Sequence, residues 1–319
     1  MKRIKRADAM GYWLRADIEP VLEVDLNESF VVETEDAFSG YIRRPEDRFS
    51  PESIPPLRME PVGMNPVAGP IYIRGVGKGD VLVVHIEEIE PWEQGVSCIM
   101  PGVGPLKDSL TWPECAGPFT KIIPHQPGPD GKYATGKAVW NDRMSWDLRP
   151  MIGTIATAPE WEQEAAIVAQ GPWGGNMDVS DMCKGTKAMF PSYHEGGLLF
   201  VGDVAGCQGD TEFHGAHDDT PATVKLRCDV IKNKKIPWVR LEKEDSIVQI
   251  CCDKPLESAV EQAVLWLVQW LVDEYGFEKR DAYMLMACCP GLRVRVYQMV
   301  STGKLRYTAG AEFSKRYLP

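Results

Sequence analysis

Short apolar runs separated by turn-forming residues recur along the first half of the chain. Residues 21–24, 30–35, 71–73 and 81–89 are rich in the β-branched and apolar residues that favour strands, with Asp, Asn and Gly residues between them. This spacing predicts short strands joined as hairpins. Residues 43–66, rich in Pro, Glu and Met, predict a long surface connection in a position to fold over a site.

Strand-like runs return in the second half, after a stretch rich in Gly, Pro and Trp that predicts irregular structure. These runs cover residues 151–157, 165–169, 198–201, 223–230 and 247–251. The two halves together predict a mainly β chain.

One strong helix is expected late in the chain. Apolar residues recur with helical spacing over residues 256–272, Asp253 is positioned to cap the start, and Gly276 suits the end. Trp266 and Trp270 lie on a second face, and a helix that is apolar on nearly all sides either lies in the core or covers an interface. The pattern leaves both open. Two further elements complete the prediction: a short helix over 279–287 and a strand over 292–300.

Composition and charge exclude several classes of function. The 319 residues carry 35 Lys and Arg against 46 Asp and Glu, a net charge of −11 that argues against a general nucleic-acid binder. No apolar stretch is long enough to span a membrane, and no apolar run follows the basic N-terminus. Nine cysteines, two pairs of them adjacent in sequence, favour a reduced, cytoplasmic compartment over a disulfide framework.

Two Gly-rich, acidic segments carry the candidate chemistry. They are GGNMD at residues 174–178 and a stretch at 202–219 that contains Asp203, Asp210 and Glu212. Glycine lets the backbone approach a ligand closely, and the acids supply oxygen ligands for a hard cation or a general base. Asx-type turns would account for the same composition, and spacing alone does not separate the two interpretations.

The same segments resemble the central signature of the acetamidase/formamidase family. Residues 65–70, 79–84 and 151–159 match other blocks of that family in order, and the resemblance extends over most of the chain. It implies a mainly β fold with a jelly-roll or β-sandwich-like part at residues 1–160. A smaller α+β part, residues 161–319, would carry the long late helix and the acidic signature.

The resemblance also implies a reaction and a set of partners. The expected activity is hydrolysis of a small aliphatic amide to a carboxylate and ammonia, assisted by a divalent metal ion. The small amide is the expected partner, in a homo-oligomer that binds neither nucleic acid nor membrane.

Three positions depart from the family pattern because histidine is missing from them. Trp173 and Ala205 stand where the family reads His, and residues 11–15 lack the usual N-terminal His. A zinc site built on those imidazoles is therefore not expected in the same form. Carboxylates alone favour Ca²⁺, Mg²⁺ or Mn²⁺, so the metal is expected to be one of these, or Zn²⁺ on a changed set of ligands.

Roles can be assigned to the side chains from their chemistry. Asp178 and Asp203 are expected to hold the metal, and either Asp210 or Glu212 is expected to activate water as general base. Substrate binding is assigned to Trp173, Asn176, Cys207, Gln208 and His217.

Two other functions remain open at this point. A member of the family that has lost its histidines can persist as a small-ligand-binding protein. Alternatively, Cys207 acts as the nucleophile of a hydrolase for a different C–N bond, which requires a neighbour that lowers its pKa. A small buried cysteine that fills space is the simpler interpretation of Cys207.

Overall fold

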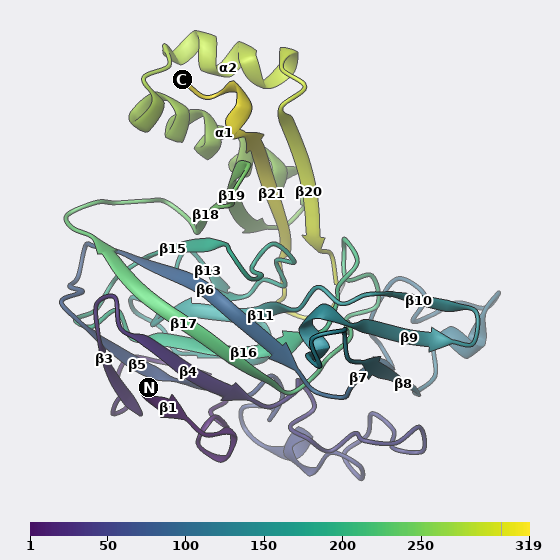
Figure 1. Ribbon diagram of the computed structural model, residues 1–319. Helices are drawn as coiled ribbons and strands as arrows, with labels where there is room; N and C mark the ends of the chain where they lie inside the picture. Colours follow the sequence, from purple (N-terminus) through teal and green to yellow (C-terminus); the bar gives the residue numbers. More distant parts are fainter. Residues whose placement is uncertain (301) are drawn as a thin grey trace.

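Two large mixed sheets pack face to face in this computed structural model, which describes residues 1–300 and 302–319 (Figure 1). The first sheet has nine strands, in the order β1 (Arg3–Ile4), β4 (Ser29–Thr34), β17 (Ala222–Ile231), β6 (Val81–Pro91), β15 (Lys187–Pro191), β18 (Arg240–Glu242), β19 (Ser246–Asp253), β21 (Tyr307–Ser314) and β20 (Leu292–Gln298). The second has six, in the order β13 (Gln170–Gly171), β14 (Gly174–Asn176), β11 (Met151–Thr157), β16 (Leu199–Ala205), β5 (Val67–Arg74) and β3 (Leu22–Asp25).

Two smaller sheets complete the β structure. A four-stranded sheet with a projecting β9–β10 hairpin has the order β10 (Met144–Asp147), β9 (Lys137–Asn141), β8 (Phe119–Gln126) and β7 (Gln94–Ile99) (Figure 1). β2 (Trp13–Leu14) pairs with β12 (Glu164–Ala165). The mainly β prediction is confirmed, and residues 1–160 and 161–319 both contribute strands to both large sheets.

The main core lies between the two large sheets. In β17, buried Val224, Leu226 and Cys228 alternate with less buried polar residues, as expected for a strand with one face in the core. β11 and β16 are buried along their whole length, because a second apolar cluster covers their other face. A polar side chain on either of these strands is therefore placed inside the protein.

A smaller unit of two helices packs on the far end of the first sheet (Figure 1). Helix α1 (Leu256–Tyr275) ends at Gly276, whose φ of 70° is the left-handed conformation that glycine adopts readily, and α2 (Lys279–Cys288) follows. The expected cap was wrong by two residues, since Pro255 holds the N-cap position. Asp253 instead accepts a 2.5 Å hydrogen bond from the Ser258 hydroxyl.

Most strands lie where the apolar runs predicted them, and residues 151–157 match β11 at both ends. The strand expected over residues 165–169 was wrong, because residues Ala166–Val168 form a 3₁₀ helix. The stretch rich in Gly, Pro and Trp that precedes residue 151 was expected to be irregular, but it contains strands β8, β9 and β10. No helix in the described part of the chain is long and apolar enough to cross a membrane.

Helix α1 packs on β19 and β21 through one face, so the two sides of the helix should respond differently to truncation. Leu267 is fully buried in this contact, whereas Leu265 is 50% exposed. We expect Leu267→Ala to lower the free energy of unfolding by about 2–5 kcal/mol because it leaves a cavity. Leu265→Ala should change it by less than about 0.5 kcal/mol. Urea denaturation of the two variants measures the difference, and equal losses would contradict this packing.

Candidate active site

A cavity of about 260 Å³ opens beside the ends of β14, β16 and β20. One part of its wall is polar and the other is apolar. The polar lining residues are Asn65, Asn176, Asp178, Asp203, Glu212, His217, Asp219, Gln298 and Thr302. The apolar ones are Ala37, Phe38, Phe49, Val62, Met64, Met100, Val103, Ile167, Val168, Val300 and Leu305.

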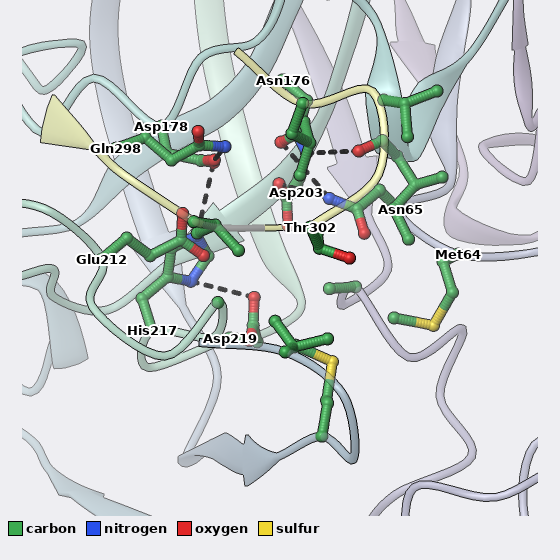
Figure 2. Close-up of a pocket in the computed structure, with 18 of the residues that line it drawn as sticks. Met64, Asn65, Asn176, Asp178, Asp203, Glu212, His217, Asp219, Gln298 and Thr302 are labelled. Atoms are coloured by element: carbon green, nitrogen blue, oxygen red, sulfur yellow. Dashed lines mark hydrogen bonds and ion pairs between the residues drawn. The ribbon is translucent and has the colours of Figure 1, made fainter. Parts of the chain in front are cut away.

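Three of the polar side chains converge on one point. Asp178 follows β14, Asp203 lies within β16, and His217 lies on the loop between β16 and β17. One ligand atom from each lies within 4.8 Å of the others, and all three residues are buried. Figure 2 shows this cluster together with Glu212. Two carboxylates and an imidazole in such an arrangement form a candidate metal centre.

Neighbouring amide and hydroxyl groups orient the two carboxylates. The Gln298 side chain donates a 3.0 Å hydrogen bond to Asp178 Oδ2. Asn65 Nδ2 donates to Asp203 Oδ2 at 2.7 Å, and the Thr154 hydroxyl lies 3.2 Å from the same oxygen. The other oxygen of each carboxylate stays free and faces the centre of the cluster. Hydrogen-bond partners of metal ligands commonly orient them in this way.

His217 is oriented by a carboxylate behind it. Its Nδ1 lies 2.9 Å from Asp219 Oδ1, and its Nε2 lies 3.6 Å from Asp178 Oδ1. Asp219 is itself fixed, because its backbone bridges to Val96 and to Ala205 of β16. This arrangement leaves Nε2 directed at the cluster, the geometry of a carboxylate–histidine pair that supports a metal ligand.

The backbone around the cluster is in an unusual conformation. Asn65, Asp178, Asp203 and Glu212 all have positive φ, between 44° and 54°. Non-glycine residues rarely adopt this region, and such residues concentrate at functional sites where surrounding contacts enforce them. The strain turns all four side chains into one cavity.

The charges in the cluster are not balanced by protein groups. Among the residues that the structure describes, Asp178 Oδ1, Asp203 Oδ1 and Glu212 Oε2 are buried without a hydrogen-bond partner. Burial raises the pKa of Asp203 well above its usual value, and Asp178 adds to the shift while His217 opposes it. Burial, followed by repulsion from Asp178, likewise raises the pKa of Glu212. A divalent cation held by Asp178, Asp203 and His217 would relieve both effects, so these residues fit a metal.

The neighbouring carboxylates also raise the pKa of the imidazole. Burial alone would lower the pKa of His217, but the Asp219 charge and the close contacts with the Asp178 and Asp219 carboxylates outweigh it. The pKa of His217 therefore lies well above its usual value. As the one cationic group against several acids, it offsets part of their charge.

The structure brings five of the nine proposed site residues to the cavity and leaves four outside it. Asn176, Asp178, Asp203, Glu212 and His217 line it. The amide nitrogen and the oxygen of the Asn176 side chain both have partners inside the protein: the amide donates to the Ile167 carbonyl, and the oxygen accepts from the Asn65 amide. Asn176 thus holds the wall of the cavity in place.

Trp173 and Asp210 lie away from the cavity. Trp173 is buried in the apolar cluster that covers β16, where its indole N–H donates to Glu162 at 3.3 Å. Asp210 is half exposed and pairs with Arg295. Neither is in a position to touch a molecule bound at the acid cluster.

Cys207 and Gln208 line a separate hollow walled by Trp140 and Trp146. The Gln208 amide donates to the backbone carbonyls of Asp178 and Tyr297, which fixes the loop after β14. Burial raises the pKa of Cys207 to about 11. Its side chain is therefore a neutral thiol near pH 7 and a weak nucleophile.

Sequence reasoning missed Asn65, Thr154, Asp219 and Gln298 as site residues. Asp219 and Asn65 lie within segments that resemble the family, residues 202–219 and 65–70. The sequence does not show that their side chains point into the cavity. Gln298 lies 120 positions from its partner Asp178 and carries no local signal.

Comparison with known proteins gives consistent matches over the chain. A model described as the Acetamidase/Formamidase family matches residues 6–160 and 151–309. A putative formamidase of Schizosaccharomyces pombe is 24% identical over 274 residues, which are 68% of this chain and 63% of that relative. The chain thus spans less than two thirds of the length of this curated relative.

Solved structures match over nearly the whole chain. An acetamidase from Yersinia enterocolitica is 31% identical with a TM-score of 0.87, covering 100% of this chain and 93% of its own. An acetamidase from Bacillus halodurans is 28% identical with a TM-score of 0.86, covering 99% and 98%.

Gly153 makes room for the acid cluster, which gives a direct test of the site. A Cβ at this position would lie 2.7 Å from Asp178 Oδ1 and 2.8 Å from both Oδ2 and the backbone oxygen of Asp203. We expect Gly153→Ala to push the two carboxylates apart and to weaken Mn²⁺ binding at least about tenfold, measured by calorimetry on metal-stripped protein. Gly117→Ala, where the Cβ meets nothing within 4 Å, is the control. Equal Mn²⁺ affinity in the two variants would exclude a metal site at the cluster.

Proposed function

The chain belongs to the acetamidase/formamidase family, and from this premise we propose that it hydrolyses the C–N bond of a non-peptide amide with the help of a divalent metal ion. The observation that carries the proposal is the convergence of Asp178, Asp203 and His217 on one point of a cavity, with Glu212 beside them. An amide is unreactive, so its hydrolysis needs both a polarised carbonyl and an activated water, and this group of residues supplies the means for both.

Asp178, Asp203 and the Nε2 atom of His217 are the proposed metal ligands. A bound divalent ion would act as a Lewis acid on the amide carbonyl and lower the pKa of water. The imidazole shifts the expected metal toward Zn²⁺ or Mn²⁺, because Ca²⁺ and Mg²⁺ prefer oxygen ligands alone. The missing family histidines therefore do not remove the metal site from this proposal, since His217 contributes an imidazole from another position.

Glu212 is the proposed general base. It is buried at the cluster, and its Oε2 has no hydrogen-bond partner among the described residues, so it is free to accept a proton. In the proposed reaction Glu212 takes a proton from water as the hydroxyl adds to the carbonyl carbon. The same proton then passes to the amide nitrogen, the C–N bond breaks, and ammonia and a carboxylic acid leave, the acid losing its proton to water as the carboxylate forms.

The alternative with Cys207 as nucleophile is not favoured. Cys207 lies outside the cavity, and its raised pKa keeps the thiol protonated. The ligand-binding alternative predicts that the protein binds an amide but never releases ammonia, so the first experiment below separates it from the hydrolase.

Metal removal tests the reaction as a whole. We expect the purified protein to contain about one divalent ion per chain and to release ammonia from amides. Chelation followed by dialysis should abolish the release, and Zn²⁺ or Mn²⁺ should restore it. Elemental analysis and an ammonia assay on the same samples give the result. Full activity in metal-free protein would overturn metal assistance and leave hydrolysis standing.

Glu212 and Asp210 are two residues apart, and their variants separate the two candidate bases. We expect Glu212→Gln to lower kcat about 10²–10⁴-fold while the metal content stays unchanged, because only proton transfer is lost. Asp210→Asn, at the exposed partner of Arg295, should leave kcat within about twofold. The opposite order of effects would transfer the role of base to Asp210.

A further inference from the structure

We infer that the substrate is a neutral amide with an apolar acyl group, an unbranched chain of about four to eight carbons or a phenyl ring, rather than formamide or acetamide. The inference rests on the proposed function, because it takes the acid cluster as the place where the C–N bond is cleaved. It adds the chemical nature of the acyl chain, which is the part of the substrate that extends away from the C–N bond.

The first argument is the size of the cavity. Its volume is about 260 Å³, whereas an apolar cavity of about 150 Å³ is enough to hold benzene. Formamide and acetamide carry no more than one carbon beyond the amide group. They would leave most of this space to water.

The second argument is the chemistry of the wall away from the acids. Phe38, Met64, Met100 and Leu305 line it and are buried. In Figure 2, Met64 lies on the opposite side of the cavity from Glu212 and His217. An amide group at the acid cluster therefore directs its acyl chain along an apolar surface, where each buried methylene stabilises the complex.

The third argument is charge. Among the described residues that line the cavity there is no Lys or Arg, so a carboxylate on the acyl chain would have no partner and would meet the acids instead. An ammonium group at the far end would lie against the buried methionines and phenylalanine and lose its hydration. Both kinds of charged chain are disfavoured, which leaves a neutral apolar one.

Kinetics on a homologous series tests the inference. We expect kcat/KM for ammonia release to rise from acetamide through butyramide to hexanamide, by up to about fourfold per methylene and at least tenfold in total. Heptanamide and 6-aminohexanamide are matched in length, and the charged compound should be at least about tenfold poorer. A kcat/KM for acetamide equal to or above that for hexanamide, or equal values for the matched pair, would overturn the inference while leaving amide hydrolysis intact.

Val103 offers a variant in the apolar part of the wall. Its side chain packs beside Gly215 on the loop between β16 and β17, so the readout is a ratio of two substrates that share the same acid cluster. Val103 is half-buried on an irregular connection, so a larger side chain is less disruptive here than in the core. We expect Val103→Phe to lower the ratio of kcat/KM for hexanamide to that for acetamide at least about tenfold by filling space in the apolar part of the cavity. Val294→Phe, exposed on β20 and outside the cavity, should leave the ratio unchanged. An unchanged ratio in Val103→Phe would place the acyl chain elsewhere.

Calorimetry measures hexanamide binding and so tests the apolar cavity even if the protein hydrolyses no amide. If no amide in the series releases ammonia, the proposed function fails, and binding of hexanamide decides the nature of the cavity. Binding with a negative change in heat capacity, weakened by Val103→Phe, supports an apolar ligand. Absence of hexanamide binding in the millimolar range overturns it.

Discussion

The candidate active site depends on one physical constraint: several carboxyl groups are buried around a single histidine. Asp178, Asp203, Glu212 and Asp219 all lie in a largely water-excluded wall, and His217 is the one cationic group among them. Two like charges about 4 Å apart repel by about 4 kcal/mol at the effective dielectric constant of a protein, so such a cluster does not form without compensation. The hydrogen bonds from Asn65, Thr154 and Gln298 supply part of it, and a divalent cation fits the remainder. The three donors come from three distant segments, so the site exists only when the whole chain is folded.

Strand β20 shows how the smaller helical unit takes part in this arrangement. Gln298 at its end holds Asp178, and two residues nearby hold Asp181 on the same loop: the Tyr297 hydroxyl at 2.7 Å and Arg295 at 2.9 Å. Asp181 is fully buried, and although burial alone would raise its pKa, the Tyr297 hydroxyl and adjacent cations hold that pKa below its usual value. The loop that carries a proposed metal ligand is thus clamped by a strand that pairs with β21, on which helix α1 packs.

The sequence indicated the local elements well because their cause is local. Alternating apolar positions determine β17, a short run of apolar and small residues determines the fully buried β11, and helical spacing with Gly276 determines α1. No local pattern in the sequence determines whether an acidic side chain points into the cavity or toward solvent. Asp210 and Glu212 look equivalent in the chain, but positive φ at Thr211 and Glu212 turns the loop, so Asp210 faces solvent beside Arg295 and Glu212 faces the cavity. Pairings such as Gln298 with Asp178 depend on which strands become neighbours, and that is decided by packing between sheets.

The two walls of the cavity have different proposed roles: the polar wall carries out the reaction, and the apolar wall selects the substrate. In the proposed reaction the acid cluster acts on the C–N bond, which is common to all amides. Its residues lie on or next to strands and on a loop bridged to β16. The apolar wall is built largely from connections, around residues 37–64, 100–103, 300 and 302–305. Connections tolerate substitution far better than buried strands do. The space beyond the amide can therefore change in size and chemistry with little effect on Asp178 and Asp203, which are held by β14 and β16. Glu212 and His217 lie on the loop between β16 and β17, and their positions depend on the bridge from Asp219 to β16.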